Sequence, residues 1–204
     1  VEKVVTGVDL GIGDFKRPND LFASEDGYLY IAASGDTAAD NRIVKLDKEL
    51  RVVRSWTGYI DADGQEVAFR EPLGVFVTPE NEIYVADGTT KNIVHMDAEG
   101  NLKRLIAAPS HEDSAIIDAD FVERYRPSKL VVDSSGRIHV VAVNVNEGSV
   151  EFDPDGEFEG FLAAGKVNAN PIEVLWKKFS TQAQLDRMAD FVPIEYNNIS
   201  LDDE

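Results

Sequence analysis

Apolar and polar positions follow the same order in three successive parts of the chain. In each part a proline is followed by a short apolar run, a turn containing Gly or Asn, and a second apolar run. The prolines are Pro18, Pro72 and Pro127, so the period is 54 and then 55 residues. A period of this length indicates a repeat architecture in which each copy is one structural unit.

Each copy continues with two further apolar stretches separated by an acidic turn. The stretches that follow this turn are Arg51–Trp56, Leu102–Ile106 and Phe158–Leu162. Each copy therefore predicts four short strands. The proline belongs at the start of the first strand, because it cannot donate a hydrogen bond to a ladder. Gly27, Asn81 and Gly136 suit the turn to the second strand, because Gly and Asn tolerate positive φ.

Four-stranded antiparallel units repeated at this period are typical of the blades of a β-propeller. One blade has two apolar faces and cannot bury them alone, so neighbouring blades must stack to form the core. We expect the strands that begin near Leu21, Val75 and Leu130 to be the innermost of each blade.

The combined pattern, F-x-x-P followed by alternating apolar residues, G-x-Φ-Y-V-A-D and an I-V-x-Φ-D segment, resembles the NHL repeat family. The resemblance covers residues 15–166 and resumes at Phe191. It implies a six-bladed propeller that acts as a binding platform. The acidic residue that ends the signature is present once, as Asp87. The lead-in at residues 9–13 and the segment at residues 176–181 are similar to bacterial NHL-repeat proteins of exported or surface-anchored type, which implies an extracytoplasmic or cell-surface location.

The predicted fold class is all-β: an NHL-type β-propeller fragment with three complete four-stranded blades, the start of a fourth, and a short helical insert. We expect residues 1–14 to supply a strand that completes another blade, residues 15–166 to form the three blades, and residues 191–204 to begin the fourth. A propeller needs roughly four to eight blades to close. We therefore expect further blades downstream, or otherwise self-association through the open blade edges.

Residues 167–190 break the strand pattern and predict two short helices. Asn170 and Pro171 suit the N-cap and the first helical position. Apolar residues then recur at helical spacing, at Ile172 and Trp176 in the first helix and at Leu185 and Met188 in the second.

Composition limits the partners and the chemistry. The 204 residues carry 38 acidic and 20 basic side chains, a net charge of −18, which disfavours nucleic acid and anionic lipid. No apolar run approaches the roughly 20 residues of a membrane span. Cysteine is absent, which excludes disulfides and thiolate sites and leaves the compartment open.

Other chemistry-bearing patterns are weak. The acidic turns at residues 61–64 and 153–157 lack the spacing of a calcium-binding EF-hand loop, so we interpret them as turns. His95, His111 and His139 have no metal-ligand spacing, and no nucleophile elbow or phosphate loop is present. We therefore predict no catalytic residue, no metal ligand and no cofactor.

Polar residues around each repeat proline are the better candidates for a ligand site, because they would line one mouth of the central channel. They are Arg17, Asn19, Asp20, Arg70, Arg126, Lys129, Asn197 and Asn198. Basic side chains beside all three prolines would attract an anionic or carboxylated ligand to this mouth. The alternative is that each Arg pairs with a neighbouring carboxylate and only stabilises its loop.

Two functions remain open from the sequence. The first is a non-catalytic binding module or scaffold whose rim binds a carbohydrate, a peptide or a protein partner. The second is a metal-dependent, lactonase-like hydrolase with its site in the central channel, to which Asn19, Asp20, Asn197 and Asn198 would contribute. Fold alone does not choose between them. The basic residues at the mouth would oppose a metal cation there, which ranks the binding module first.

Overall fold

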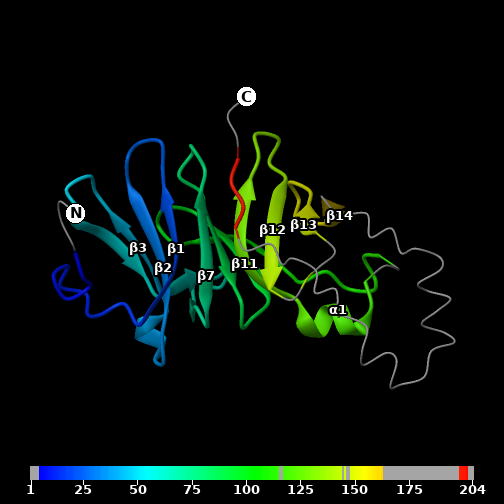
Figure 1. The fold of residues 1–204 in the computed structure, drawn as a ribbon, viewed down its shortest axis with the longest axis horizontal. Helices are drawn as coiled ribbons and strands as arrows, with labels where there is room; N and C mark the ends of the chain where they lie inside the picture. The colour runs from blue at the N-terminus through cyan, green and yellow to red at the C-terminus, as the bar shows by residue number, and fades with distance from the viewer. Residues whose placement is uncertain (1–4, 115–116, 144, 146–147, 163–197, 202–204) are drawn as a thin grey trace, which may run out of the picture.

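The computed structural model describes residues 5–114, 117–143, 145, 148–162 and 198–201. Within these residues the chain forms three four-stranded antiparallel sheets, each made of consecutive strands. The sheets lie side by side in an open arc (Figure 1). The chain thus forms three blades of a β-propeller, which confirms the predicted all-β propeller fragment.

The strands of each blade are ordered from the inside of the arc outward. The first blade contains β1 (Arg17–Ala23), β2 (Leu29–Ser34), β3 (Arg42–Leu46) and β4 (Val52–Trp56). The second contains β7 (Pro72–Val77), β8 (Ile83–Asp87), β9 (Asn92–Met96) and β10 (Leu102–Ile106). The third contains β11 (Arg126–Val132), β12 (Ile138–Val143), β13 (Ser149–Phe152) and β14 (Phe158–Leu162). The innermost strands are β1, β7 and β11, as the repeat pattern predicts.

Three smaller elements were not predicted from the sequence. A 3-10 turn, η1 (Ala38–Asp40), precedes β3, and a hairpin of β5 (Gly58–Ile60) and β6 (Glu66–Ala68) joins the first two blades. A one-and-a-half-turn helix, α1 (Ala119–Arg124), precedes β11. Asp118 caps this helix, because its Oδ1 accepts the N–H of Phe121 at 2.7 Å.

Each inner strand contains a bulge directly after its repeat proline. The register shifts between Pro18 and Asp20, between Pro72 and Gly74, and between Pro127 and Lys129. A proline has no N–H for the ladder, so it is tolerated where pairing is interrupted. The bulge therefore recurs at the same place in every blade and gives the residues after it equivalent positions.

Aspartates close five of the hairpins among the described residues in the same way. The Oδ1 atom of each accepts the backbone N–H groups two and four residues later, at 2.8–3.0 Å. The residues concerned are Asp47, Asp61, Asp97, Asp133 and Asp153. This is the local side-chain-to-backbone bonding that makes Asp favourable in turns. The acidic segments at residues 61–64 and 153–157 are therefore turns, in agreement with the sequence interpretation.

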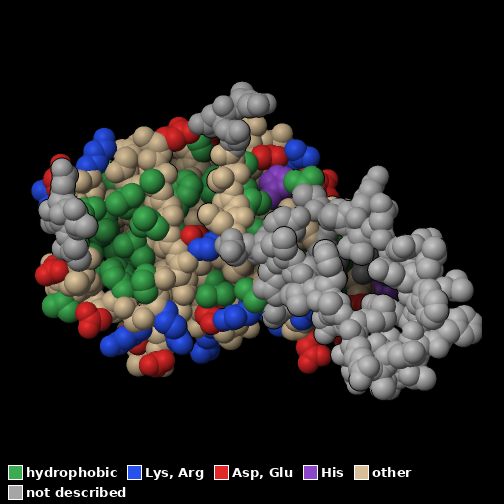
Figure 2. Space-filling view, viewed as in Figure 1, with side chains coloured by type: hydrophobic (Ala, Val, Ile, Leu, Met, Phe, Trp, Pro, Cys, Tyr) green, Lys and Arg blue, Asp and Glu red, His purple; other side chains and the backbone are tan. Residues whose placement is uncertain are grey.

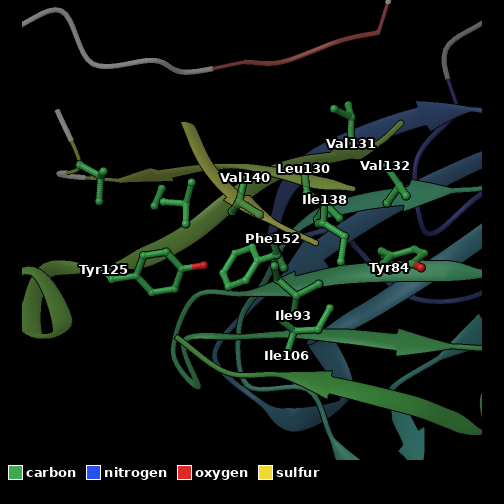
Figure 3. Close-up of a cluster of buried hydrophobic side chains, with 14 of the residues drawn as sticks. Tyr84, Ile93, Ile106, Tyr125, Leu130, Val131, Val132, Ile138, Val140 and Phe152 are labelled. Carbon is green, nitrogen blue, oxygen red and sulfur yellow. The ribbon is translucent and has the colours of Figure 1, made fainter. Parts of the chain in front are cut away.

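The core lies between the blades. Tyr30, Ile43 and Trp56 of the first blade pack against Val75 and Met96 of the second. A second cluster lies between the second and third blades and includes the residues drawn in Figure 3. Burial of each blade therefore depends on its neighbour, as in other repeat proteins.

The inner position of the first blade lacks this cover. Val75 and Leu130 are 2% and 4% exposed, whereas Leu21 at the equivalent position is 63% exposed. Among the described residues, no blade precedes β1. The proposed self-association through open blade edges stays a prediction.

Several predicted segments lie wholly or partly outside the described residues. The helical insert predicted at residues 167–190, which contains Trp176 and Met188, lies outside them. Residues 191–197 and 202–204 of the expected fourth blade lie outside them as well. Of residues 1–14, residues 5–14 are described and form turns rather than a strand, with Gly11 and Gly13 at positive φ. The strand assigned to this segment therefore stays a prediction.

Candidate functional site

A groove of about 1310 Å³ runs along the inner strands of all three blades. Residues 20–26, 75–82 and 129–134 line it from the three blades, and residues 198–201 line it as well. The inner strands approach each other closely here. A Cβ atom added to Gly74 would lie 2.5 Å from the carbonyl oxygen of Ser128, so only glycine fits at this point of β7. Close approach of the strands is what makes one continuous groove of three blades.

A polar network joins the three blades at one end of the groove. Lys129 Nζ of β11 lies 2.5 Å from the carboxylate of Asp20 and donates to the carbonyl oxygen of Asn19 at 2.6 Å, both in β1. The other Asp20 oxygen accepts the N–H of Val75 in β7 at 3.0 Å. The side chains of Lys129 and Asp20 are only 19% and 17% exposed. Two of the predicted ligand-binding residues therefore bind each other and hold the blades together.

Asn19 has a similar role between the first two blades. Its Nδ2 donates to the hydroxyl of Ser34 at 2.9 Å and to the carbonyl oxygen of Pro72 at 2.8 Å. Both N–H groups of the amide are thereby used within the protein. Asn19 is thus a link from β1 to β7.

The predicted arginines divide into two kinds. Arg126 binds Glu71 with two hydrogen bonds, of 3.2 and 2.5 Å, which is the bidentate geometry of a strong Arg–carboxylate pair. Arg17 lies 3.5 Å from the exposed Asp36, and Arg70 is exposed with no side-chain ion pair in the described part of the chain. Figure 2 shows Lys and Arg, with Asp and Glu between them, along the lower edge of the molecule. Of the predicted basic residues, Arg17 and Arg70 are those that the described contacts leave available to a ligand at this rim.

Of the two Asn residues predicted for the fourth blade, the structure describes one. Asn197 lies outside the described residues. Asn198 is described, is exposed, and lines the groove.

The single signature aspartate, Asp87, is structural. It is 1% exposed, and its carboxylate accepts the backbone N–H groups of Arg70 at 2.7 Å, Thr90 at 3.1 Å and Glu71 at 3.2 Å. It holds the chain in position just before the repeat proline of β7. The role of this residue in the signature is therefore to stabilise the strand entrance.

The opposite end of the groove is formed by the turns that follow the inner strands, and the sequence analysis did not select these residues. Glu82 lies in the β7–β8 turn and pairs with His95 at 2.7 Å and with Lys103. Partial burial opposes its charge, but the hydrogen bonds from Lys103 and His95 outweigh it and leave the pKa of Glu82 below its ordinary value. Glu25, Asp26 and Glu80 also line this end. Acidic residues recur in the turn after every inner strand, which is the pattern that could have drawn attention to them.

A segment from near the end of the chain forms one side of the groove. Residues 198–201, drawn in red in Figure 1, run beside β7 and β11. Ile199 is half-buried and packs against the cluster between the second and third blades. Figure 3 shows Val131 pointing away from the rest of that cluster, toward the side on which this segment passes. Leu201 remains 46% exposed.

The search for a metal site and for a membrane-spanning helix covers the described residues only. No group of three or more His, Asp or Glu side chains in them lies close enough together to hold a metal ion. No helix in them has the length and apolar character needed to cross a membrane.

Comparison with known proteins adds a likeness of fold. No family model and no curated protein matches the chain. Virginiamycin B lyase from Staphylococcus aureus is 16% identical over 72% of this chain and 41% of its own, with a TM-score of 0.48. A protein of unknown function from Bacteroides caccae is 13% identical over 70% of this chain and 47% of its own, with a TM-score of 0.46. The WD40 β-propeller domain of Doa1 is 18% identical over 59% of this chain and 32% of its own, with a TM-score of 0.40. The chain thus spans less than half the length of each of these structures.

Proposed function

We propose that this protein is a non-catalytic binding module whose groove along β1, β7 and β11 holds a polypeptide segment in an extended conformation. Of the three ligand classes expected from the sequence, a peptide or a peptide segment of a protein partner fits the groove best. The module is of NHL type, a proposal that rests on the three repeats at Pro18, Pro72 and Pro127. It acts outside the cytoplasm, a proposal that rests on the resemblance of residues 9–13 and 176–181 to exported or surface-anchored NHL-repeat proteins.

One observation carries this proposal: residues 198–201 of the chain lie against the inner strands and form one side of the groove. Their backbone makes no strand pairing, and the segment is anchored by the half-buried Ile199. Inner strands that pack against one extended segment present the same kind of surface to a second one, and the groove beside residues 198–201 has room for it. Apolar side chains of the inner strands, such as Phe22 and Val131, supply contact area, while exposed backbone and turn residues supply hydrogen-bonding groups.

The rim residues proposed from the sequence take a smaller part in this function. Arg17 and Arg70 can contact a ligand that extends past the groove. Asn19, Asp20 and Lys129 act indirectly, because they fix the three inner strands that form the groove wall. Asn19 and Asp20 already bind Pro72, Val75 and Lys129. No specific observation therefore favours the metal-dependent hydrolase, to which these two residues would contribute.

The experiment that tests the proposal is selection of peptides from a displayed random library, followed by affinity measurement on two matched variants. Leu21→Ser changes an apolar residue of the groove that is 63% exposed, and Val53→Ser changes an apolar residue on the outer strand β4 that is 52% exposed. Loss of a Leu contact of about 1.5 kcal/mol corresponds to roughly tenfold weaker binding. We expect Leu21→Ser to lose this much and Val53→Ser to bind like the wild type. Failure to select any peptide, or equal affinity of both variants, would refute the proposal.

A further inference from the structure

The charge of the groove specifies its ligand further. We infer that the preferred ligand is a basic peptide, with an apolar residue at the place of Ile199 and Lys or Arg side chains toward the turn end of the groove. This inference rests on the proposed function, because it names the class of peptide that the groove takes.

Acidic side chains dominate the groove lining. Within the described residues the lining contains six carboxylates and one basic side chain, Lys129. The carboxylates are Asp20, Glu25, Asp26, Glu80, Glu82 and Asp133. A groove with low-dielectric walls and one predominant sign of charge raises the local concentration of ligands of the opposite sign.

Three of these carboxylates are already neutralised by the protein. Asp20 pairs with Lys129, Glu82 with Lys103, and Asp133 with Arg137 at 2.9 Å. These three carboxylates therefore add little to the attraction of the groove for a cationic ligand.

The other three carboxylates have no cationic partner among the residues that the structure describes. Glu25, Asp26 and Glu80 are exposed, and none forms an ion pair in the described part of the chain. Asp26 accepts only the hydroxyl of Ser24, at 2.5 Å. Glu25 and Asp26 lie in the β1–β2 turn and Glu80 in the β7–β8 turn, so they belong to adjacent blades at one end of the groove. Figure 2 shows carboxylate groups at this upper edge of the face.

The segment that forms one side of the groove does not satisfy these carboxylates. Residues 198–201 are Asn, Ile, Ser and Leu, so they bring an apolar anchor and no charge. In Figure 1 they run toward the end at which the turn joins β1 to β2. A ligand with the same apolar anchor, followed by Lys or Arg, would form the ion pairs with Glu25, Asp26 and Glu80 that residues 198–201 do not form. A basic peptide then displaces this segment.

The test compares two labelled peptides that differ only in their last three residues, which are acidic in one and basic in the other. One is Asn-Asn-Ile-Ser-Leu-Asp-Asp-Glu, the sequence of residues 197–204, and in the other the last three residues are replaced by Lys. Binding is followed by fluorescence anisotropy with the wild-type protein, and with Ile199→Ser, in which the packing of residues 198–201 is weakened. We expect the basic peptide to bind at least tenfold more tightly in 50 mM salt. The advantage should shrink at 500 mM salt, where the Debye length falls to roughly 4 Å.

Two charge-matched triple variants locate the effect. Glu25→Gln with Asp26→Asn and Glu80→Gln should abolish the preference for the basic peptide. Glu49→Gln with Asp63→Asn and Glu99→Gln removes the same charge from exposed turns outside the groove and should preserve it. Equal binding of both peptides, or a preference that survives the first triple variant, overturns the inference and leaves the proposed function standing. Absence of binding by either peptide, in the wild type and in Ile199→Ser, counts against the proposed function itself.

Discussion

Replacing Asp87 by Ala should destabilise the protein more than any other single change of an Asp near the rim. The carboxylate accepts three backbone N–H groups, those of Arg70, Glu71 and Thr90. Hydrogen bonds to a charged group contribute roughly 1.5–3 kcal/mol each. Arg70 and Thr90 are exposed, so water can replace the lost acceptor at their amides. We therefore expect a total loss of about 3 kcal/mol, or a melting temperature lower by roughly 6–12 °C.

The assay is urea unfolding followed by circular dichroism, with two comparison variants. Asp87→Asn keeps the Oδ1 acceptor for two of the amides and should lose about 1–2 kcal/mol. Asp36→Ala removes a carboxylate that is 89% exposed and lies 3.5 Å from Arg17, so its effect should stay within about 0.5 kcal/mol. An Asp87→Ala protein that unfolds at the same urea concentration as Asp36→Ala would show that the strand entrance does not depend on this residue.

Two further predictions concern the links between blades and the hairpin turns. Lys129→Met should lower the free energy of unfolding by about 1–3 kcal/mol, because it leaves Asp20 half-buried beside Val75 without its cation. A double-mutant cycle with Asp20→Asn should give a clear coupling energy, and simple additivity of the two changes would contradict the proposed ion pair. At Asp97, partial burial opposes the charge, but hydrogen bonds from Asn101 and the turn amides outweigh it and lower the pKa below 3.8. The stability that Asp97 adds over Asp97→Asn should therefore be complete at neutral pH and decline as the pH falls below 3.8 through the folded-state pKa; a difference that grows on acidification would disprove this.

The blades could be predicted from the sequence because their determinants are local. The proline, the turn Gly or Asn and the alternating apolar residues act within a few positions, and they recur at a constant period. Helix α1 and the β5–β6 hairpin were missed because six- and three-residue elements carry too little pattern.

The roles of the candidate site residues depend on contacts between residues that are far apart in the sequence. Lys129 and Asp20 are 109 positions apart, and Asp20 and Val75 are 55 apart. Their contact requires both the bulge after each proline and the close approach of β7 to β11. The sequence raised pairing of each Arg with a neighbouring carboxylate, as Arg126 does with Glu71, but not the pairing of Lys129 with Asp20. The groove was not anticipated either, because its lining combines the far ends of three inner strands.

The hairpin aspartates also have a consequence for the order in which the protein folds. Each bonds to amides no more than four residues away, so a turn can close before any distant part of the chain is in place. Short-range contacts form fast, whereas contacts between distant positions must first overcome the entropy of loop closure. We expect hairpins to form first, blades to follow as units, and the ion pair between Lys129 and Asp20 to form late. During synthesis, the first blade can therefore complete its four strands while the residues of the third are still being added.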